Sequence, residues 1–253
     1  MSQYIQQIVA LIEKAAGQQE EKIQALAERI AESIGAGGVL HAFGTGHSHM
    51  LCEELFHRSG GLVPVNAIVD VNLTQWGSVN PSLLERMPGY AKLILAAHDL
   101  RAGEVLLVIS NSGINPVTVE VAQEAKQRGL FVAALTSAGA YRDVPSRHPS
   151  GLKLSDVAEL VIDTGVPKGD GVVEVDPKLP KVGPASTVVT AALINAVLVE
   201  TVNRLVAAGF EPPIFISGNV GGDEHNDVLM KRYADRIPVY YKIMTTRKPS
   251  RGG

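Results

Sequence analysis

The chain has 253 residues, of which 45% are hydrophobic and 19% charged, and this balance excludes disordered and fibrous proteins. Its 23 basic and 26 acidic residues give a net charge of −3, so no overall positive field draws it to nucleic acid. The single cysteine, Cys52, cannot form a disulfide within the chain, and the charged N-terminal region lacks the apolar run of a signal peptide. Composition therefore predicts a cytoplasmic protein that binds a small molecule, with no nucleic-acid or membrane partner.

Apolar residues recur at helical spacing in two stripes within residues 1–35. Gly17 lies between the stripes, and Gly35 follows the second one. Because glycine commonly interrupts or ends a helix, the pattern predicts an N-terminal helical hairpin ahead of the main domain. The stripes are formed by Ile5, Ile8, Val9 and Ile12, and by Ile23, Leu26, Ile30 and Ile34.

Five short apolar runs follow, each ending in small polar residues. Apolar residues at nearly every position suit strands that are covered on both faces, and alternation with helical patterns implies crossovers between parallel strands. The sequence therefore predicts a doubly wound α/β fold with a parallel five-stranded sheet, in a core over residues 36–210. The runs span residues 38–43, 62–69, 104–110, 130–135 and 159–163.

The remaining segments differ in character. The apolar stretch 188–199 carries Thr190 and Asn195 and is shorter than the roughly 20 residues of a membrane span, so it predicts a buried helix. Irregular stretches over 70–81, 137–152 and 164–184 are long for a compact domain, which favours functional loops. Residues 211–244 form a C-terminal segment of the same domain, and the polar, basic residues 245–253 predict a flexible tail.

The first predicted strand ends in Gly44-Thr45-Gly46-His47-Ser48-His49, and a helical pattern follows. The glycines permit a tight turn close to a ligand, while Thr45 and Ser48 offer hydroxyls near the free N–H groups of a helix start. The stretch predicts a phosphate-binding loop. It lacks the third glycine of GxGxxG and the GK[ST] of a P-loop, which argues against dinucleotides and nucleoside triphosphates, and we expect no cofactor.

The third predicted strand ends in Ser110-Asn111-Ser112-Gly113-Ile114-Asn115-Pro116, again before a helical pattern. Hydroxyls and amides supply hydrogen-bond donors without a fixed positive charge, which suits a phosphomonoester that is released in each turnover. Either loop alone is equally compatible with an ordinary helix N-cap. Because ligands of open parallel sheets bind at the carboxyl ends of the strands, two such loops together favour a phosphate site.

These two loops and Leu135-Thr136-Ser137 resemble the SIS family of sugar-phosphate isomerases and binding domains, over about residues 1–210. The resemblance implies a flavodoxin-like fold. The stretch GTGHSHMLCEELFHRSGGLVPVN is similar to an uncharacterised bacterial group allied to phosphoheptose isomerase, and the N-acetylmuramic acid 6-phosphate etherase is a further relative. The family implies a phosphate held by Thr45, Ser110, Asn111, Ser112 and Asn115, in a site that includes Gly44, Gly46, His47, Ser48, Gly113, Thr136 and Ser137. Serine is common in the family at position 46, where Ser48 is expected to substitute, and threonine is common at position 115.

The family's shared chemistry opens a sugar ring and removes the proton next to the carbonyl, which requires a base and usually an acid. Glu53, Glu54 and His57 follow the first loop, and His57 lies three and four residues from the two carboxylates, on a shared helix face. We expect Glu54 to be the base, because an ungapped match with phosphoheptose isomerase puts it at a functional position where that enzyme has a histidine. Arg58 is expected to hold a carboxylate or bind substrate. Each acidic or imidazole group is also compatible with a solvated or paired position on the helix.

Three further features bear on the site. His225, in the glycine-rich stretch SGNVGGDEHN, resembles a histidine that completes the site in some family members, and it is alternatively a helix cap. Ser186 begins the long helix and is expected to face the substrate or to cap that helix. The pair His47 and His49 raises the question of zinc, which phosphoheptose isomerases use, but without CxxC or HExxH spacing we expect no metal.

The sequence thus predicts an enzyme that acts on a hexose 6-phosphate, with an amino or N-acetylamino sugar such as N-acetylglucosamine 6-phosphate as the expected substrate, by isomerisation or by loss of the 3-hydroxyl. The main alternative is a sensor that binds a sugar phosphate without turnover. Such sensors usually carry a helix-turn-helix domain, for which this chain has no basic recognition helix. A dinucleotide enzyme is a weaker alternative. The family's habit of forming sites between subunits predicts a homodimer or larger homo-oligomer.

Overall fold

A computed structural model describes residues 2–77 and 80–246, and it contains the predicted five-stranded parallel sheet. The strand order is β2-β1-β3-β4-β5, with every neighbouring pair parallel. Each strand coincides with one of the predicted apolar runs to within a few residues, which confirms the fold class. The strands are β1 (Leu40–Gly44), β2 (Val65–Ile68), β3 (Val105–Ile109), β4 (Phe131–Thr136) and β5 (Leu160–Asp163).

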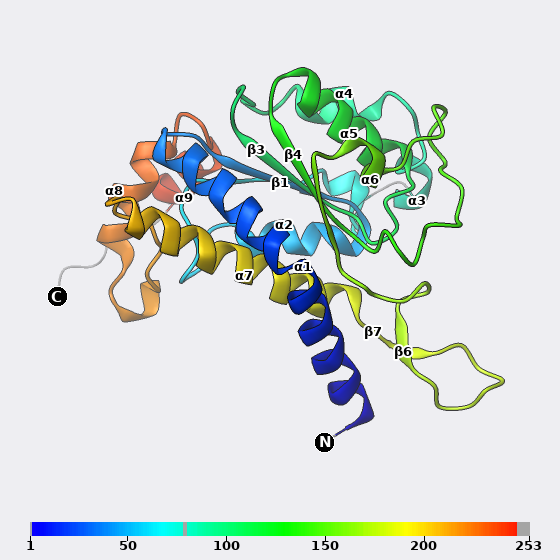
Figure 1. Cartoon of the computed structure of the whole chain (residues 1–253). Helices are drawn as coiled ribbons and strands as arrows, with labels where there is room; N and C mark the ends of the chain where they lie inside the picture. The colour runs from blue at the N-terminus through cyan, green and yellow to red at the C-terminus, as the bar shows by residue number, and fades with distance from the viewer. Residues whose placement is uncertain (1, 78–79, 247–253) are drawn as a thin grey trace.

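Helices cover both faces of the sheet, as the doubly wound pattern requires (Figure 1). On one face, α1 (Gln3–Gly35), α2 (His49–Leu55) and α7 (Ser186–Ala207) share an apolar core with β1, β3 and β4. On the other face, α4, α5 and α6 form a second core with the same strands. These helices are α4 (Tyr90–Leu95), α5 (Pro116–Gln127) and α6 (Leu154–Val157), and the short α3 (Pro81–Leu84) precedes them.

The N-terminal 35 residues do not form a hairpin, because α1 is one continuous helix of 33 residues. Gly17 lies within it at an exposed position. A single glycine lowers helix stability by about 1 kcal/mol, and its neighbours Lys14, Ala15, Ala16, Gln18 and Gln19 are strong helix formers that offset this. The apolar spacing was therefore a correct indication of helix, but the interruption at Gly17 was wrong.

The long apolar helix α7 is a core helix that packs along α1. It contributes eight buried residues, among them Val189, Leu193 and Ile194. Its length and composition alone would also allow it to cross a membrane. Its packing against α1 in the shared core explains the apolar composition, as the sequence predicted.

The N-terminal part of α1 extends beyond the sheet and lies beside a small hairpin (Figure 1). This hairpin, β6 (Gly171–Val173) and β7 (Val182–Pro184), falls within the stretch that was expected to be irregular. The Tyr4 hydroxyl donates to the Pro184 carbonyl oxygen at 2.8 Å. Gly183, with a φ of +75°, lies so close to the Tyr4 ring that a Cβ there would come within 2.6 Å of it.

The C-terminal segment packs at the amino edge of the sheet. Its helices α8 (Asp223–Tyr233) and α9 (Val239–Thr246) form a third apolar cluster with Val39 and Val63, which directly precede β1 and β2. The Tyr240 hydroxyl donates to the Val63 carbonyl oxygen at 2.6 Å. Of the predicted tail, residues 245 and 246 belong to α9, and the rest lies outside the described residues.

Buried polar groups join this segment to the strands at the same edge. Glu104 accepts from Arg236 Nη2 at 2.6 Å and from His41 Nε2 at 2.9 Å. Asn66 Nδ2 lies 3.0 Å from His41 Nδ1 and 3.3 Å from His98 Nδ1, which continues the network. A buried charge is stable only when it has partners, and each of these groups has one. The cluster therefore has a structural role at the amino edge, and no catalytic role is needed to explain its ionisable residues.

The continuity of α1 predicts the effect of replacing Gly17 by alanine. No atom lies within 4 Å of the position of a Cβ at Gly17, so Gly17→Ala is expected to raise the free energy of unfolding by about 1 kcal/mol. Urea unfolding followed by circular dichroism measures this difference. Loss of stability in the variant would instead indicate a turn at this glycine.

Candidate active site

The strand order creates a crevice between β1 and β3. Gly44 at the end of β1 pairs with Ile109 at the end of β3, so the loops that follow start side by side. The chain then leaves in opposite directions, because α2 packs on one face of the sheet and α5 on the other. In sheets of this order, ligands bind at such a switch point. The two predicted phosphate loops therefore lie together at the expected place.

The first loop is a tight turn that requires its glycines. A Cβ at Gly44 would lie 2.6 Å from the Ser48 carbonyl oxygen, and Gly46 has a φ of +52°. The Ser48 N–H donates to the Thr45 carbonyl oxygen at 2.9 Å, which closes the turn. Thr45 is buried, Ser48 is half-buried, and His47 is exposed. His49 is buried, and its Nδ1 hydrogen-bonds to the Gly46 carbonyl oxygen.

Residues 138–153, which we name the strap, hold the second loop from outside. Their flanking residues Ser137 and Leu154 contribute to the same support. Three carbonyl oxygens of the loop accept backbone N–H groups from these residues. Ser137 donates to Asn111 at 2.9 Å, Arg147 to Ile114 at 2.9 Å and Leu154 to Gly113 at 2.8 Å. With these acceptors occupied, the groups that the loop presents to a ligand are mainly donors, which favours an anion.

Thr136 and Ser137, predicted as part of the site, lie at the end of β4 and support the second loop. Both are buried, and Thr136 Oγ1 donates to the Asn111 carbonyl oxygen at 3.3 Å. The Ser137 hydroxyl donates to the carbonyl oxygen of Val166. Gly113 has a φ of +63°, and a Cβ there would lie 3.0 Å from Thr136 Oγ1. These residues therefore position the loop and are not placed to touch a ligand directly.

A carboxylate that sequence reasoning missed lies between the two loops. Glu85 directly follows α3, and its Oε2 accepts from Asn115 Nδ2 of the second loop at 2.8 Å. Its Oε1 would lie 3.3 Å from a Cβ at Gly46 of the first loop. In the sequence, the feature that could have indicated Glu85 as a site residue was its position shortly after the long irregular stretch 70–81, which follows β2. No local motif marks it, because both of its neighbouring loops are distant in sequence.

The surroundings of Glu85 act on its acidity in opposite directions. Burial raises the pKa of the carboxyl group above its ordinary value, and this effect is the largest. Hydrogen bonds from Thr45 and Asn115 and the positive charges of Arg86 and Arg147 lower the pKa and only partly compensate. A carboxyl group with a raised pKa is suited to take up and return a proton near neutral pH.

The predicted catalytic carboxylates of α2 are both engaged by neighbouring side chains. Glu54 forms an ion pair with Arg58, as expected for that arginine, and also accepts from Asn195 Nδ2 of α7 at 3.3 Å. Glu53 is largely exposed, and its carboxylate lies 3.6 Å from His49 Nε2. Both carboxylates are therefore paired in the way that the alternative interpretation described.

The two remaining histidine candidates lie toward the amino edge. The His57 ring packs edge-on against Phe215 with centroids 5.0 Å apart, and Tyr240 lies nearby. His225 is exposed, and its Nε2 lies 3.1 Å from the Ile214 carbonyl oxygen. Within one chain, the segment 211–244 therefore does not complete the site at the loops, contrary to expectation. The glycine-rich pattern gave no information on which edge of the sheet the segment would cover.

Ser186 serves the start of α7. Its hydroxyl donates to Asp170 Oδ2 at 2.8 Å and its N–H to Oδ1 at 2.7 Å. Ser186 therefore helps to cap α7, as one of its two predicted roles required, with Asp170 as the acceptor.

Over residues 2–77 and 80–246, no group of three His, Cys, Asp or Glu side chains is arranged to hold a metal ion.

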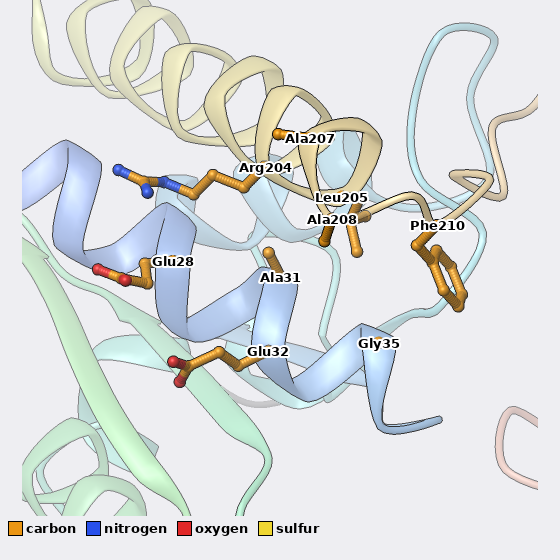
Figure 2. Close-up of a pocket in the computed structure, with 9 residues that line it drawn as sticks. All are labelled: Glu28, Ala31, Glu32, Gly35, Arg204, Leu205, Ala207, Ala208 and Phe210. Carbon is orange, nitrogen blue, oxygen red and sulfur yellow. The ribbon is translucent and has the colours of Figure 1, made fainter.

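A cavity of about 490 Å³ lies elsewhere, between the C-terminal ends of α1 and α7 (Figure 2). Glu28 and Glu32 of α1 line it, and Arg204 extends from α7 across it. Arg204 Nη2 already donates to Gln24 at 2.8 Å. Two carboxylates and an engaged arginine disfavour a phosphate, so this cavity is not the candidate site.

The comparisons agree with this fold. The SIS domain model matches residues 3–137, and the chain belongs to the SIS domain family. It is similar to a UPF0309 protein of Halalkalibacterium halodurans, with 42% identity over 241 residues that cover 94% of this chain and 96% of the relative. Among solved structures, a Bacteroides fragilis protein described as a phosphosugar isomerase involved in capsule formation matches with a TM-score of 0.50. That match has 22% identity and covers 82% of this chain and 91% of the other, and it supports the fold.

The two carboxylates at opposite edges of the sheet predict opposite effects on stability. Because the pKa of Glu85 is raised by folding, ionisation above that pKa destabilises the fold, and Glu85→Gln is expected to increase the free energy of unfolding at pH 8 but not at pH 4. Burial also raises the pKa of Glu104, but hydrogen bonds from His41 and Arg236 outweigh it and the net pKa is lowered. Glu104→Gln is therefore expected to lose about 2 kcal/mol at pH 8, and less as the pH falls.

Urea unfolding of both variants at the two pH values measures these differences. Equal destabilisation by the two substitutions at pH 8 would show that Glu85 is a structural carboxylate like Glu104.

Proposed function

We propose that this protein is a phosphosugar isomerase or dehydratase that acts on a hexose 6-phosphate, an amino or N-acetylamino sugar such as N-acetylglucosamine 6-phosphate. The observation that carries the proposal is the Glu85 carboxyl group, which lies between two hydroxyl-rich loops at the switch point of the sheet. We place the reaction in the cytoplasm, where a sugar phosphate is both formed and used.

In this proposal the phosphate occupies the two loops. The hydroxyls of Ser48, Ser110 and Ser112 and the backbone N–H groups of the second loop are the donors, while the Thr45 hydroxyl, which donates to Glu85, links the base to the phosphate-binding loop. These donors stabilise the dianion without lysine or arginine in the loops themselves, which agrees with the net charge of −3. Asn111 Oδ1 is buried without a hydrogen-bond partner in the described part of the chain, so it is available to accept from a substrate hydroxyl.

Glu85 is then the base for the open-chain sugar. Its ionised carboxylate removes the C2 proton, and the electron pair forms a C1–C2 double bond while the C1 oxygen takes the negative charge. In a sugar with a hydroxyl at C2 this intermediate is an enediolate, and isomerisation follows when the O2 proton moves to O1 and the proton held by Glu85 returns to C1, which gives the ketose. In an amino or N-acetylamino sugar the nitrogen stays on C2 and proton return gives no ketose, so the enolate instead expels the 3-hydroxyl as water, with the proton of Glu85 supplied to the leaving oxygen. The substrate thus sets the outcome, because both routes share the first step.

Glu54 is the second candidate base, and Glu53, His57 and His225 are further candidates for a site completed by another copy of the chain. Asn195 and Arg58 bind the Glu54 carboxylate within one chain and hold it between α2 and α7. Variants of Glu54 and Glu85 therefore separate the two assignments.

Deuterium exchange tests the function directly. In deuterated water the wild-type protein is expected to incorporate deuterium at C2 of its hexose 6-phosphate, as followed by NMR. Glu85→Gln keeps the shape of the side chain but cannot take up the proton, so the exchange rate is expected to fall by about 10²–10⁴-fold.

Glu54→Gln is the matched control and is expected to retain most of the rate. Loss of exchange in Glu54→Gln alone would move the base to α2. Binding of sugar phosphates without exchange in any of the three proteins would instead favour the sensor function.

We also propose that a second copy of the chain covers the extended part of α1 and the β6–β7 hairpin. This surface exposes apolar side chains from three elements, joined through the Tyr4–Pro184 contact. A stable dimer buries roughly 800 Å² on each partner, and such a patch favours association. The exposed side chains are Ile5, Val9, Val175, Leu179, Val182 and Val188.

A charge placed on this surface is expected to separate the subunits. Val9→Glu buries an unpaired carboxylate in the interface, so sedimentation velocity is expected to show monomers where the wild type is dimeric. Leu93→Glu, at an exposed position of α4 on the opposite face, is the control and leaves the dimer intact. A monomeric wild type at micromolar concentration would contradict this assembly.

A further inference from the structure

Asn115 connects the candidate base to a cation at the entrance of the site. Its Nδ2 donates to Glu85 Oε2 at 2.8 Å, and its Oδ1 accepts from Arg147 Nη1 at 2.9 Å. Asn115 stands at the N-cap position of α5, yet its side chain makes no capping hydrogen bond. The amide is therefore engaged entirely in a bridge between a carboxylate and a guanidinium.

The guanidinium fixes which way the amide faces. Arginine has only donors, so the atom of Asn115 that faces Arg147 must be the oxygen. The amide nitrogen then faces Glu85, where it donates to the carboxylate. A hydrogen bond to the charged form of an acid favours that form. If the amide were free to turn over, its oxygen would accept a hydrogen bond from the protonated carboxyl group of Glu85. This bond would favour the neutral form of Glu85.

The strap holds Arg147 in position for this role. The Arg147 N–H donates to the Ile114 carbonyl oxygen, one residue before Asn115. Lys153 Nζ donates to the carbonyl oxygens of Tyr141 and Arg142 at 3.0 and 2.7 Å, which ties the two ends of the strap together. The Ser146 hydroxyl donates to the Leu152 carbonyl oxygen at 2.6 Å. The backbone at Arg147 is thus anchored on both sides.

We propose that Arg147 is a positioning residue, which acts through Asn115 to keep Glu85 ready to accept a proton. The inference rests on the proposed function in so far as Glu85 is the base. The Arg147 guanidinium contacts the Asn115 amide, and through that amide it is connected to Glu85. Its contribution is a fixed amide orientation together with a positive charge near the carboxylate.

The groups that face Glu85 come from four segments. They are Thr45 of the first loop, Arg86 beside it in sequence, Asn115 of the second loop and Arg147 of the strap, and all four lower its pKa. Substitution of Arg147 by glutamine removes the charge and, because glutamine both donates and accepts, also frees the Asn115 amide to turn over. The pKa of Glu85 is then expected to rise.

The test compares four proteins: the wild type, Arg147→Gln, Arg147→Lys and Arg142→Gln. Arg147→Lys keeps a cation that only donates, so it is expected to remain close to the wild type. Arg142→Gln removes an exposed arginine from the same strap and is the matched control. NMR titration of proteins with ¹³C-labelled glutamate, with the Glu85 signal assigned from Glu85→Gln, gives the midpoint for this carboxyl group without any substrate.

Arg147→Gln alone is expected to raise the Glu85 midpoint and to shift the acid limb of the pH profile of C2 exchange in the same direction. An unchanged midpoint in Arg147→Gln, or an equal rise in Arg142→Gln, would overturn the inference. A raised midpoint in a protein that exchanges no sugar phosphate would support the positioning role and reject the proposed function. The two failures are therefore distinguishable.

Discussion

The structure depends on the side-by-side pairing of β1 and β3 with helices that depart to opposite faces. Gly44 and Ile109 are neighbours across the sheet, but α2 and α5 belong to different cores. This divergence leaves the polar loops of both strands side by side at the carboxyl edge. The Glu85 carboxyl group reaches both loops from the segment after β2. The proposed phosphate-binding loops and the proposed base are thus brought together by topology, since no local sequence feature joins these three segments.

Two carboxylates, the buried Glu104 and the half-buried Glu85, have opposite roles at the two edges of the sheet. At the amino edge, Glu104 is surrounded by His41 and Arg236, and folding lowers its pKa. At the carboxyl edge, folding raises the pKa of Glu85, because its hydrogen bonds and nearby charges do not compensate for burial. The first arrangement stabilises the protein and ties the C-terminal segment to the strands. The second is unfavourable for folding, which is characteristic of groups retained for chemistry.

Local periodicity was sufficient to predict the strands and the long helix α7, and the glycines and polar residues after two strands predicted the turns that follow them, because each depends on residues that are close in sequence. Local periodicity gave the wrong structure or position where contacts between residues distant in sequence determine it. The helix through Gly17 is stabilised by packing on α7, which a scan of residues 1–35 cannot show. Glu85 becomes a site residue only through Gly46 and Asn115, and His225 is placed by the third apolar cluster with Val39 and Val63. The resemblance pointed to the two loops that the structure places side by side, but it did not indicate that Glu85 lies between them.

The strap supports the second loop through its backbone and influences the acidity of Glu85 through one side chain, so these two properties can change independently. Its backbone N–H groups occupy the outward carbonyl oxygens of the second loop, and this support does not depend on the side chains of residues 138–153. The side chain at position 147, in contrast, reaches the carboxylate through a single amide. Substitutions along this stretch are therefore expected to alter the acidity of Glu85 while the backbone support of the second loop is preserved. If the proposed function holds, evolution could adjust the working pH of the site through changes confined to one surface segment.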